Sequence, residues 1–272
     1  MEHPLHRMRS WRHRPALRSR RLLLGLGLFG WLLPAAGCGP AIRPANCNFG
    51  PAQEVVANGI QALGGLERWQ SVGAIQARAI VTMYDEQGTA VVHEQQQVIS
   101  PRAGELVATA ALPNGKYRIR VSSAGRAEFQ GPPGLLSPEL KGRLLSAMQM
   151  TLHRVRGPYN LCLGERAGRP ENAAIEGRSL TRVPVAGGVQ DIRAYYFDPR
   201  NRLLTYATAG GDMAGQSGTV TRYAWEFPGN GLAFPSGIGV VRIGQDVLLG
   251  QAKVLDVAYH NVRIAQNRRN GV

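Results

Sequence analysis

The sequence predicts an α+β protein that consists mainly of antiparallel β-strands in one curved sheet, with helices covering one face of that sheet. Two observations support this prediction. After a helical pattern that ends near Trp69, the hydrophobic repeat changes from about 3.6 residues to two, which is typical of strands with one buried face. About ten such segments then follow one another with hairpin-length turns, and a single amphipathic helix interrupts the series.

The composition is that of a globular protein. The chain has 272 residues, of which 44% are hydrophobic and 18% are charged, so it can bury a core in one or two domains. Its formal net charge is +14, but seven of the 32 basic residues and one of the 18 acidic residues lie in residues 1–37. The rest of the chain therefore carries +8. It contains no run of five like charges and no nucleic-acid-binding motif, and we expect no nucleic-acid partner.

The first 37 residues have the pattern of an export signal. A basic segment precedes an apolar run of about a dozen residues, Leu22–Leu33, whereas a membrane-spanning helix needs about 20. The next residues, Ala35-Ala36-Gly37-Cys38, resemble a bacterial lipobox, although Ala35 stands where the pattern prefers Leu. The resemblance implies attachment of diacylglycerol to Cys38 and cleavage before it. Ordinary signal cleavage is the alternative, and both general secretion and twin-arginine export stay open.

On this interpretation the chain divides into a removed signal peptide (1–37), a lipidated tether (38–50), one folded domain (51–265) and a tail (266–272). Gly39 rather than Asp follows the lipidated cysteine, which resembles the default for outer-membrane delivery. We therefore expect a lipid-anchored cell-envelope protein, in the outer membrane and facing the periplasm. With Cys38 lipidated, Cys47 and Cys162 remain in an oxidising compartment and permit one disulfide; two separate thiols are the alternative.

Two stretches predict helices. Pro51 opens the first, whose apolar residues recur every three or four positions as far as Trp69, and Gly64-Gly65 allows a break within it. The second covers residues 137–157, with Ser137 as its N-cap and Gly157 at its end. The apolar stripe of this second helix consists of Leu144, Leu145, Met148, Leu152 and Val155.

Strand patterns occupy most of the remaining chain. They cover Ala74–Tyr84, Ala90–Ile99, Glu105–Leu112, Tyr117–Ser123, Ser179–Val185, Asp191–Phe197, Leu203–Thr208, Val220–Phe227, Gly231–Val241 and Ala252–Ile264. Turn residues separate them; Asn114-Gly115 is the strongest hairpin signal, since both residues tolerate positive φ. The second strand lies in "TAVVHEQQQVIS", which alternates less cleanly than the others, and we expect it near an edge of the sheet.

Four segments, in this order, resemble LolA/LolB-like periplasmic proteins and lipoproteins. They are "IQALGGLERWQSV", "YYFDPRNRLLTYAT", "GNGLAFPSGIGV" and "AYHNVRI", and together they span most of residues 52–265. The resemblance implies an open half-barrel of antiparallel strands, with helices over its concave face and an apolar concavity that holds acyl chains. Under this hypothesis the stripe Leu144, Leu145, Met148, Leu152 and Val155 lines the concavity; a permanent place in the core is the alternative for the same residues.

No catalytic or metal-binding motif is recognisable in the sequence. His93, His153 and His260 are the only histidines after residue 37, and they lie far apart without a Cys-x-x-Cys or His-Glu-x-x-His companion. We expect His153 to be a surface or boundary residue of its helix. We expect no metal, no cofactor and no enzymatic activity; the oligomeric state is left open.

The leading functional hypothesis is a membrane-anchored lipoprotein that binds an acyl chain, a lipid or a lipoprotein, in lipid or lipoprotein trafficking. Burial of apolar surface would supply the binding free energy, at about 25 cal/mol per Å². The alternatives are a structural or sensory envelope lipoprotein that uses the same fold to bind protein, and an uncharacterised enzyme.

Overall fold

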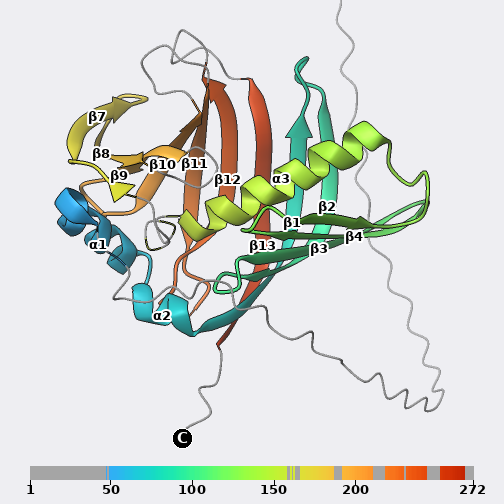
Figure 1. Cartoon of the computed structure of the whole chain (residues 1–272), viewed down its shortest axis with the longest axis horizontal. Helices are drawn as coiled ribbons and strands as arrows, with labels where there is room; N and C mark the ends of the chain where they lie inside the picture. The colour runs from blue at the N-terminus through green and yellow to red at the C-terminus, as the bar shows by residue number, and fades with distance from the viewer. Residues whose placement is uncertain are drawn as a thin grey trace, which may run out of the picture. The chain divides into compact units, whose positions relative to one another are not determined.

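A computed structural model describes residues 47, 49–157, 160, 162, 166–186, 192–210, 218–229, 231–243 and 252–266. Its main element is one open, curved, antiparallel sheet (Figure 1). Thirteen strands lie within the described residues: β1 Val72–Tyr84, β2 Ala90–Ser100, β3 Glu105–Leu112, β4 Gly115–Ser122, β5 Ala127–Gln130, β6 Arg166–Ala167, β7 Glu171–Ile175, β8 Arg178–Ala186, β9 Ile192–Phe197, β10 Leu204–Gly210, β11 Gly218–Glu226, β12 Phe234–Ile243 and β13 Lys253–Gln266.

The sheet consists of two meanders joined by the first and last strands of the chain. The strand order is β5-β4-β3-β2-β1-β13-β12-β11-β10-β9-β8-β6, and β7 pairs with β8 outside this path. The long pairing of β1 with β13 runs from Val72 opposite Gln266 to Met83 opposite Leu255. The first and last strands of the folded domain therefore pair in the middle of the sheet. This pairing joins the two halves of the sheet to each other.

The prediction of about ten strands missed β5, β6 and β7. These strands have four, two and five residues, and most of their side chains are exposed or only half-buried, so they lack the regular alternation of a strand with one buried face. The edge position expected for the second strand is wrong, because β2 lies between β1 and β3. Its alternation is weak for a different reason: the buried face of β2 carries polar side chains.

The first helical segment divides in two, as the glycine pair allows. A short 3₁₀ turn, Gly50–Ala52, leads into α1 (Gln53–Ala62), and α2 (Leu66–Ser71) follows the break. Gly64 has φ +108°, and a Cβ atom there would lie 2.5 Å from the carbonyl oxygen of Gly231. Both the conformation and the close approach require glycine at this position.

The long helix α3, Pro138–Arg156, crosses the concave face of the sheet (Figure 1). It begins as predicted: the Ser137 hydroxyl accepts a hydrogen bond from the Leu140 amide at 3.2 Å, and Pro138 occupies the first turn, where its missing N–H is not needed. Between α3 and the sheet lies the main hydrophobic core.

A second, smaller apolar cluster lies on the opposite face of the later strands. Hairpin β7–β8 contributes Ile175 and Leu180 to it, and these pack with residues such as Tyr196 and Tyr206. Glu176, at the turn of this hairpin, accepts a hydrogen bond from the Tyr206 hydroxyl at 2.8 Å and forms an ion pair with Arg222. The hairpin thereby covers part of the outer face of the sheet.

Candidate ligand-binding site

The apolar stripe of α3 faces the sheet. Leu144, Met148 and Leu152 are fully buried, Val155 is 1% exposed, and Leu145 is half-buried at the border of the same core. Opposite them the central strands present small side chains, including Ala77 and Ala79 of β1 and Ala108 of β3. Small residues on the sheet leave room for the larger residues of the helix, so the two surfaces interdigitate.

A row of polar side chains interrupts this apolar interior. His93, Gln95 and Gln97 alternate along β2, so all three point to the concave side, and each is at most 3% exposed. The fourth member is Tyr117 of β4, which is 2% exposed. We call these four side chains the polar row. Polar groups in an apolar interior are tolerated only when they are hydrogen-bonded.

The hydrogen bonds of the polar row run in one direction. The Gln97 amide donates to Gln95 Oε1 at 2.8 Å, and the Gln95 amide donates to the Tyr117 hydroxyl at 3.0 Å. The Tyr117 oxygen also lies 3.1 Å from His93 Nδ1. A phenol oxygen can accept two hydrogen bonds, so this contact by itself fits either imidazole tautomer. We assign the hydroxyl proton to His93 Nδ1, because the buried hydroxyl hydrogen would otherwise have no acceptor among the described residues.

This direction leaves one free group at each end of the polar row. Burial lowers the pKa of His93 and keeps the imidazole neutral, so its remaining proton is on Nε2. That N–H has no partner among the described residues, and neither does the acceptor Gln97 Oε1. The second amide hydrogen of Gln97 points to the Met148 sulfur of α3 at 3.6 Å. The row thus presents one unpaired donor and one unpaired acceptor inside the protein.

The surroundings of the polar row are aromatic and apolar. The Tyr117 ring stacks on Phe129 of β5 with 5.6 Å between centroids, and it meets the His93 ring edge-on. Lys141 of α3 lies 5.0 Å from the centroid of the Phe129 ring, with its side chain exposed. Burial raises the pKa of Tyr117, so this residue remains a phenol.

The last turn of α3 contains a second group of buried polar residues. His153, Arg154 and Arg156 are each at most 3% exposed, so the surface or boundary position expected for His153 is wrong. Burial, together with the charges of Arg156 and Arg154, lowers the pKa of His153 to about 4. Residues beyond α3 contact this turn, since the Asn160 side-chain amide donates to the His153 carbonyl at 3.1 Å, and the helical pattern of α3 alone does not contain that information.

The protein should become less stable as the pH falls from about 6.5 to 4. The unfolded chain protonates His153 near pH 6.5, whereas the folded chain does so only near pH 4, and the stability lost across this window is about 3 kcal/mol. Urea titrations at a series of pH values would measure it. His153→Leu should make the profile less steep but not flat, because burial also lowers the pKa of His93. His260→Leu, on the exposed side of β13, should leave the profile unchanged. Identical slopes for wild type and His153→Leu would contradict this assignment.

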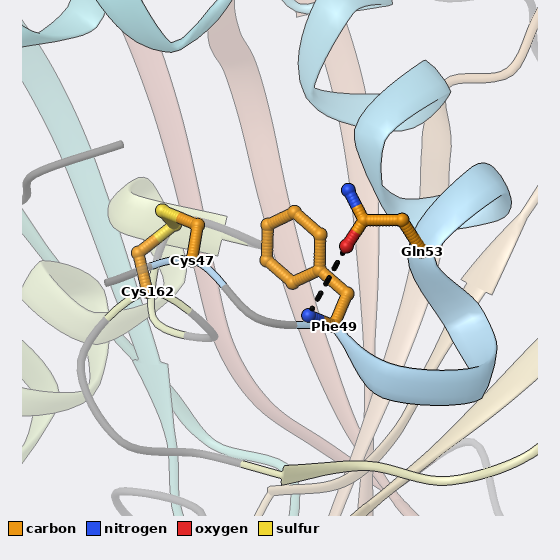
Figure 2. Close-up of a disulfide and its surroundings, with 4 residues drawn as sticks. All are labelled: Cys47, Phe49, Gln53 and Cys162. Atoms are coloured by element: carbon orange, nitrogen blue, oxygen red, sulfur yellow. Dashed lines mark hydrogen bonds between the residues drawn. A yellow bond between two sulfur atoms is a disulfide. The ribbon is translucent and has the colours of Figure 1, made fainter. Parts of the chain in front are cut away.

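Cys47 and Cys162 are joined by a disulfide (Figure 2). The bridge connects the start of the described chain to the segment after α3. Next to it, Phe49 is buried in the main core, and its amide donates to Gln53 Oε1 of α1 at 3.4 Å (Figure 2). Two residues of the predicted tether, Cys47 and Phe49, therefore contact the folded body. Cys38 and the rest of the predicted signal and tail lie outside the described residues, apart from Gln266, which ends β13.

No group of three or more His, Cys, Asp or Glu side chains in the described part of the chain could hold a metal ion. No helix within the described ranges has the length and hydropathy to cross a membrane.

The fold and this interior define a class: an open antiparallel half-barrel whose concave face is covered by a crossing helix. No family model matches the sequence, and no curated protein matches it. In structure, the chain is similar to a DUF1329 family protein from Desulfovibrio piger, with a TM-score of 0.50 and 8% identity over 82% of this chain and 95% of that one. At this identity the similarity shows the fold alone.

Two further solved structures are similar at lower TM-scores. One is a putative outer membrane lipoprotein-sorting protein domain from Vibrio parahaemolyticus (TM-score 0.46, 8% identity, 81% of this chain and 94% of that one). The other is a LolA superfamily protein from Nitrosomonas europaea (TM-score 0.43, 10% identity, 80% and 95%). The LolA superfamily, which the sequence resembles, is among these structural neighbours.

Proposed function

We propose that this protein binds the apolar part of a lipid or lipoprotein between α3 and the concave face of its sheet. The observation that carries the proposal is the arrangement of α3: one amphipathic helix crosses an otherwise open sheet face, with Leu144, Met148 and Leu152 fully buried beneath it. If an acyl chain replaced the helix stripe, the sheet would lose apolar contacts with α3 and gain apolar contacts with the acyl chain. Such an exchange changes the buried apolar area little, so its free-energy difference is small.

The connections at both ends of α3 are compatible with movement of the helix relative to the sheet. Before it, Gly131-Pro132-Pro133-Gly134 forms a turn with Gly134 at φ +75°. After it, Gly157 ends the helix at φ +51°, and its carbonyl accepts a hydrogen bond from Tyr195 at 3.3 Å. The disulfided segment follows directly. We therefore expect the N-terminal half of α3 to move more readily than the C-terminal turn.

We further propose that the protein works as a lipoprotein anchored through Cys38, in the outer membrane and facing the periplasm, in lipid or lipoprotein trafficking. The signal-like leader supports export, and the Cys47–Cys162 bridge supports an oxidising compartment. Two or more acyl chains on Cys38 would hold the protein durably at a membrane. We propose no catalytic role.

A structural or sensory envelope lipoprotein that binds protein is the second candidate. The burial of four of the five α3 stripe residues favours it, because side chains that fill the concavity also suit a permanent core. The two candidates differ in whether an apolar ligand can enter beneath α3.

Ligand binding separates the two candidates. We expect the wild type in the membrane fraction and the Cys38→Ala variant in the soluble fraction. The soluble variant should carry copurified lipid by native mass spectrometry and bind the apolar dye N-phenyl-1-naphthylamine. Within the Cys38→Ala chain, Leu145→Asp places a carboxylate at the half-buried border of the stripe and should weaken dye binding about tenfold.

Ser146→Asp is the matched control, because Ser146 is next to Leu145 in the chain but its side chain is exposed. This variant should bind the dye as tightly as the Cys38→Ala parent. A Cys38→Ala protein that is folded, free of lipid and unable to bind the dye would refute the ligand-binding function and favour the protein-binding candidate.

A further inference from the structure

We propose that the polar row is a head-group site, which selects an amphiphile with an uncharged, hydrogen-bonding head such as an ester or a hydroxyl. This inference rests on the proposed function, because it assumes that a ligand enters between α3 and the sheet. It adds the chemical class of the ligand, which the apolar stripe alone does not specify.

The polar row lies among apolar neighbours. The other inward positions of β1, β3 and β4 near it are apolar, for example Ala79, Ala110 and Ile119. A strand that only had to fill a core would carry apolar residues at these three inward positions of β2 as well, as it does at Ile99. Polar groups at these positions require hydrogen bonds that apolar residues would not, and even so His93 Nε2 and Gln97 Oε1 are left without a partner.

The two ends of the polar row offer opposite hydrogen-bonding groups. His93 presents an N–H donor, which suits a carbonyl or hydroxyl oxygen, and Gln97 presents an acceptor, which suits a hydroxyl or amide hydrogen. Four residues of extended strand separate the ends by about 13 Å. A single small head group would therefore bind at one end only. A larger head group, or the ester linkage between head group and acyl chain, would reach the other end as well.

The polar row carries no formal charge. The row consists of a neutral imidazole, a phenol and two amides. An ionised carboxylate or phosphate placed against it would lose its hydration without meeting a cation of the row, and that desolvation is unfavourable. The arrangement therefore favours an acylglycerol or a fatty alcohol over an ionised fatty acid.

The test compares ligands that share one acyl chain. The soluble Cys38→Ala protein is titrated with 1-monopalmitoylglycerol and with palmitate, each by displacement of N-phenyl-1-naphthylamine. We expect at least about tenfold tighter binding of the ester than of palmitate. His93→Phe and Gln97→Leu should each weaken monopalmitoylglycerol binding about fivefold, the factor that one neutral hydrogen bond gives, without changing dye affinity. Gln96→Leu, on the exposed side of the same strand, should change neither.

A second measurement does not depend on the folding of these variants. In the ¹⁵N spectrum of histidine-labelled Cys38→Ala protein, His93 should be neutral and protonated at Nε2. This signal should move when monopalmitoylglycerol binds and stay in place when the dye binds. A proton on Nδ1, or no shift with the ester, would overturn the inference.

The outcomes also distinguish this inference from the proposed function. If the protein binds dye and lipid but binds palmitate as tightly as monopalmitoylglycerol, the head-group site is overturned and the proposed function stays intact. The same holds if His93→Phe and Gln97→Leu bind monopalmitoylglycerol as tightly as the parent. Failure of dye and both lipids to bind would overturn both.

Discussion

Replacing Cys47 and Cys162 together by serine should lower the free energy of unfolding by about 4–5 kcal/mol. The bridge joins residues 115 positions apart, and in the chain-entropy model closure of a loop of this size restricts the unfolded chain by about that much. The bridge also holds the segment with Phe49, which is 4% exposed, against the main core. Urea unfolding followed by circular dichroism would measure the difference.

The reduced wild type is the natural control. In the presence of a reductant it should unfold at the same urea concentration as the Cys47→Ser/Cys162→Ser variant, whereas the oxidised wild type should unfold at a clearly higher one. A loss below about 1 kcal/mol would show that the bridge does not constrain the unfolded chain. We also expect single variants, such as Cys162→Ser, to be as unstable as the double variant.

Replacing Tyr117 by phenylalanine should lower the free energy of unfolding by about 4 kcal/mol, although it removes only one oxygen atom. That hydroxyl accepts from Gln95 and donates to His93, and both partners are at most 3% exposed. Its removal leaves two buried polar groups without a partner, at about 1–3 kcal/mol for each. Thermal and urea unfolding of Tyr117→Phe against wild type would measure the loss.

Tyr84→Phe is the matched control for this prediction. The Tyr84 hydroxyl donates to Asp256 at 2.9 Å on the outer face of the sheet, where both side chains are only half-buried. Water can replace this hydrogen bond, so we expect a loss below about 1 kcal/mol. Equal losses for Tyr84→Phe and Tyr117→Phe would mean that the polar row is not the tightly paired network described above.

The long elements of the fold could be predicted because their patterns are regular. Strands β1, β3 and β4 alternate buried with less buried residues over most of their length, and α3 has both a cap and an apolar stripe. The short strands could not be predicted. β6 has only two residues, and its pairing with β8 depends on where the rest of the sheet places that edge. The residues of β6 themselves do not indicate which strand will lie beside them.

The candidate site divides in the same way. The stripe from Leu144 to Val155 follows from helical periodicity, and the structure places it on the concave side. The polar row does not follow from any pattern, because alternating polar residues on both faces of β2 resemble a solvated edge strand. The one available signal was the unbroken "HEQQQ" run, which is unusual for a strand.

By itself, the sequence determined the period and approximate bounds of the main helices and strands, the break at Gly64, and the presence of two cysteines beyond the predicted anchor at Cys38. The tertiary structure decided that β1 pairs with β13, that Cys47 meets Cys162, and that the polar face of β2 and the side chain of His153 are buried. The physical reason is the separation along the chain of the residues that determine each property. Periodicity reports which residues share a face, whereas burial and pairing depend on what distant parts of the chain bring against that face.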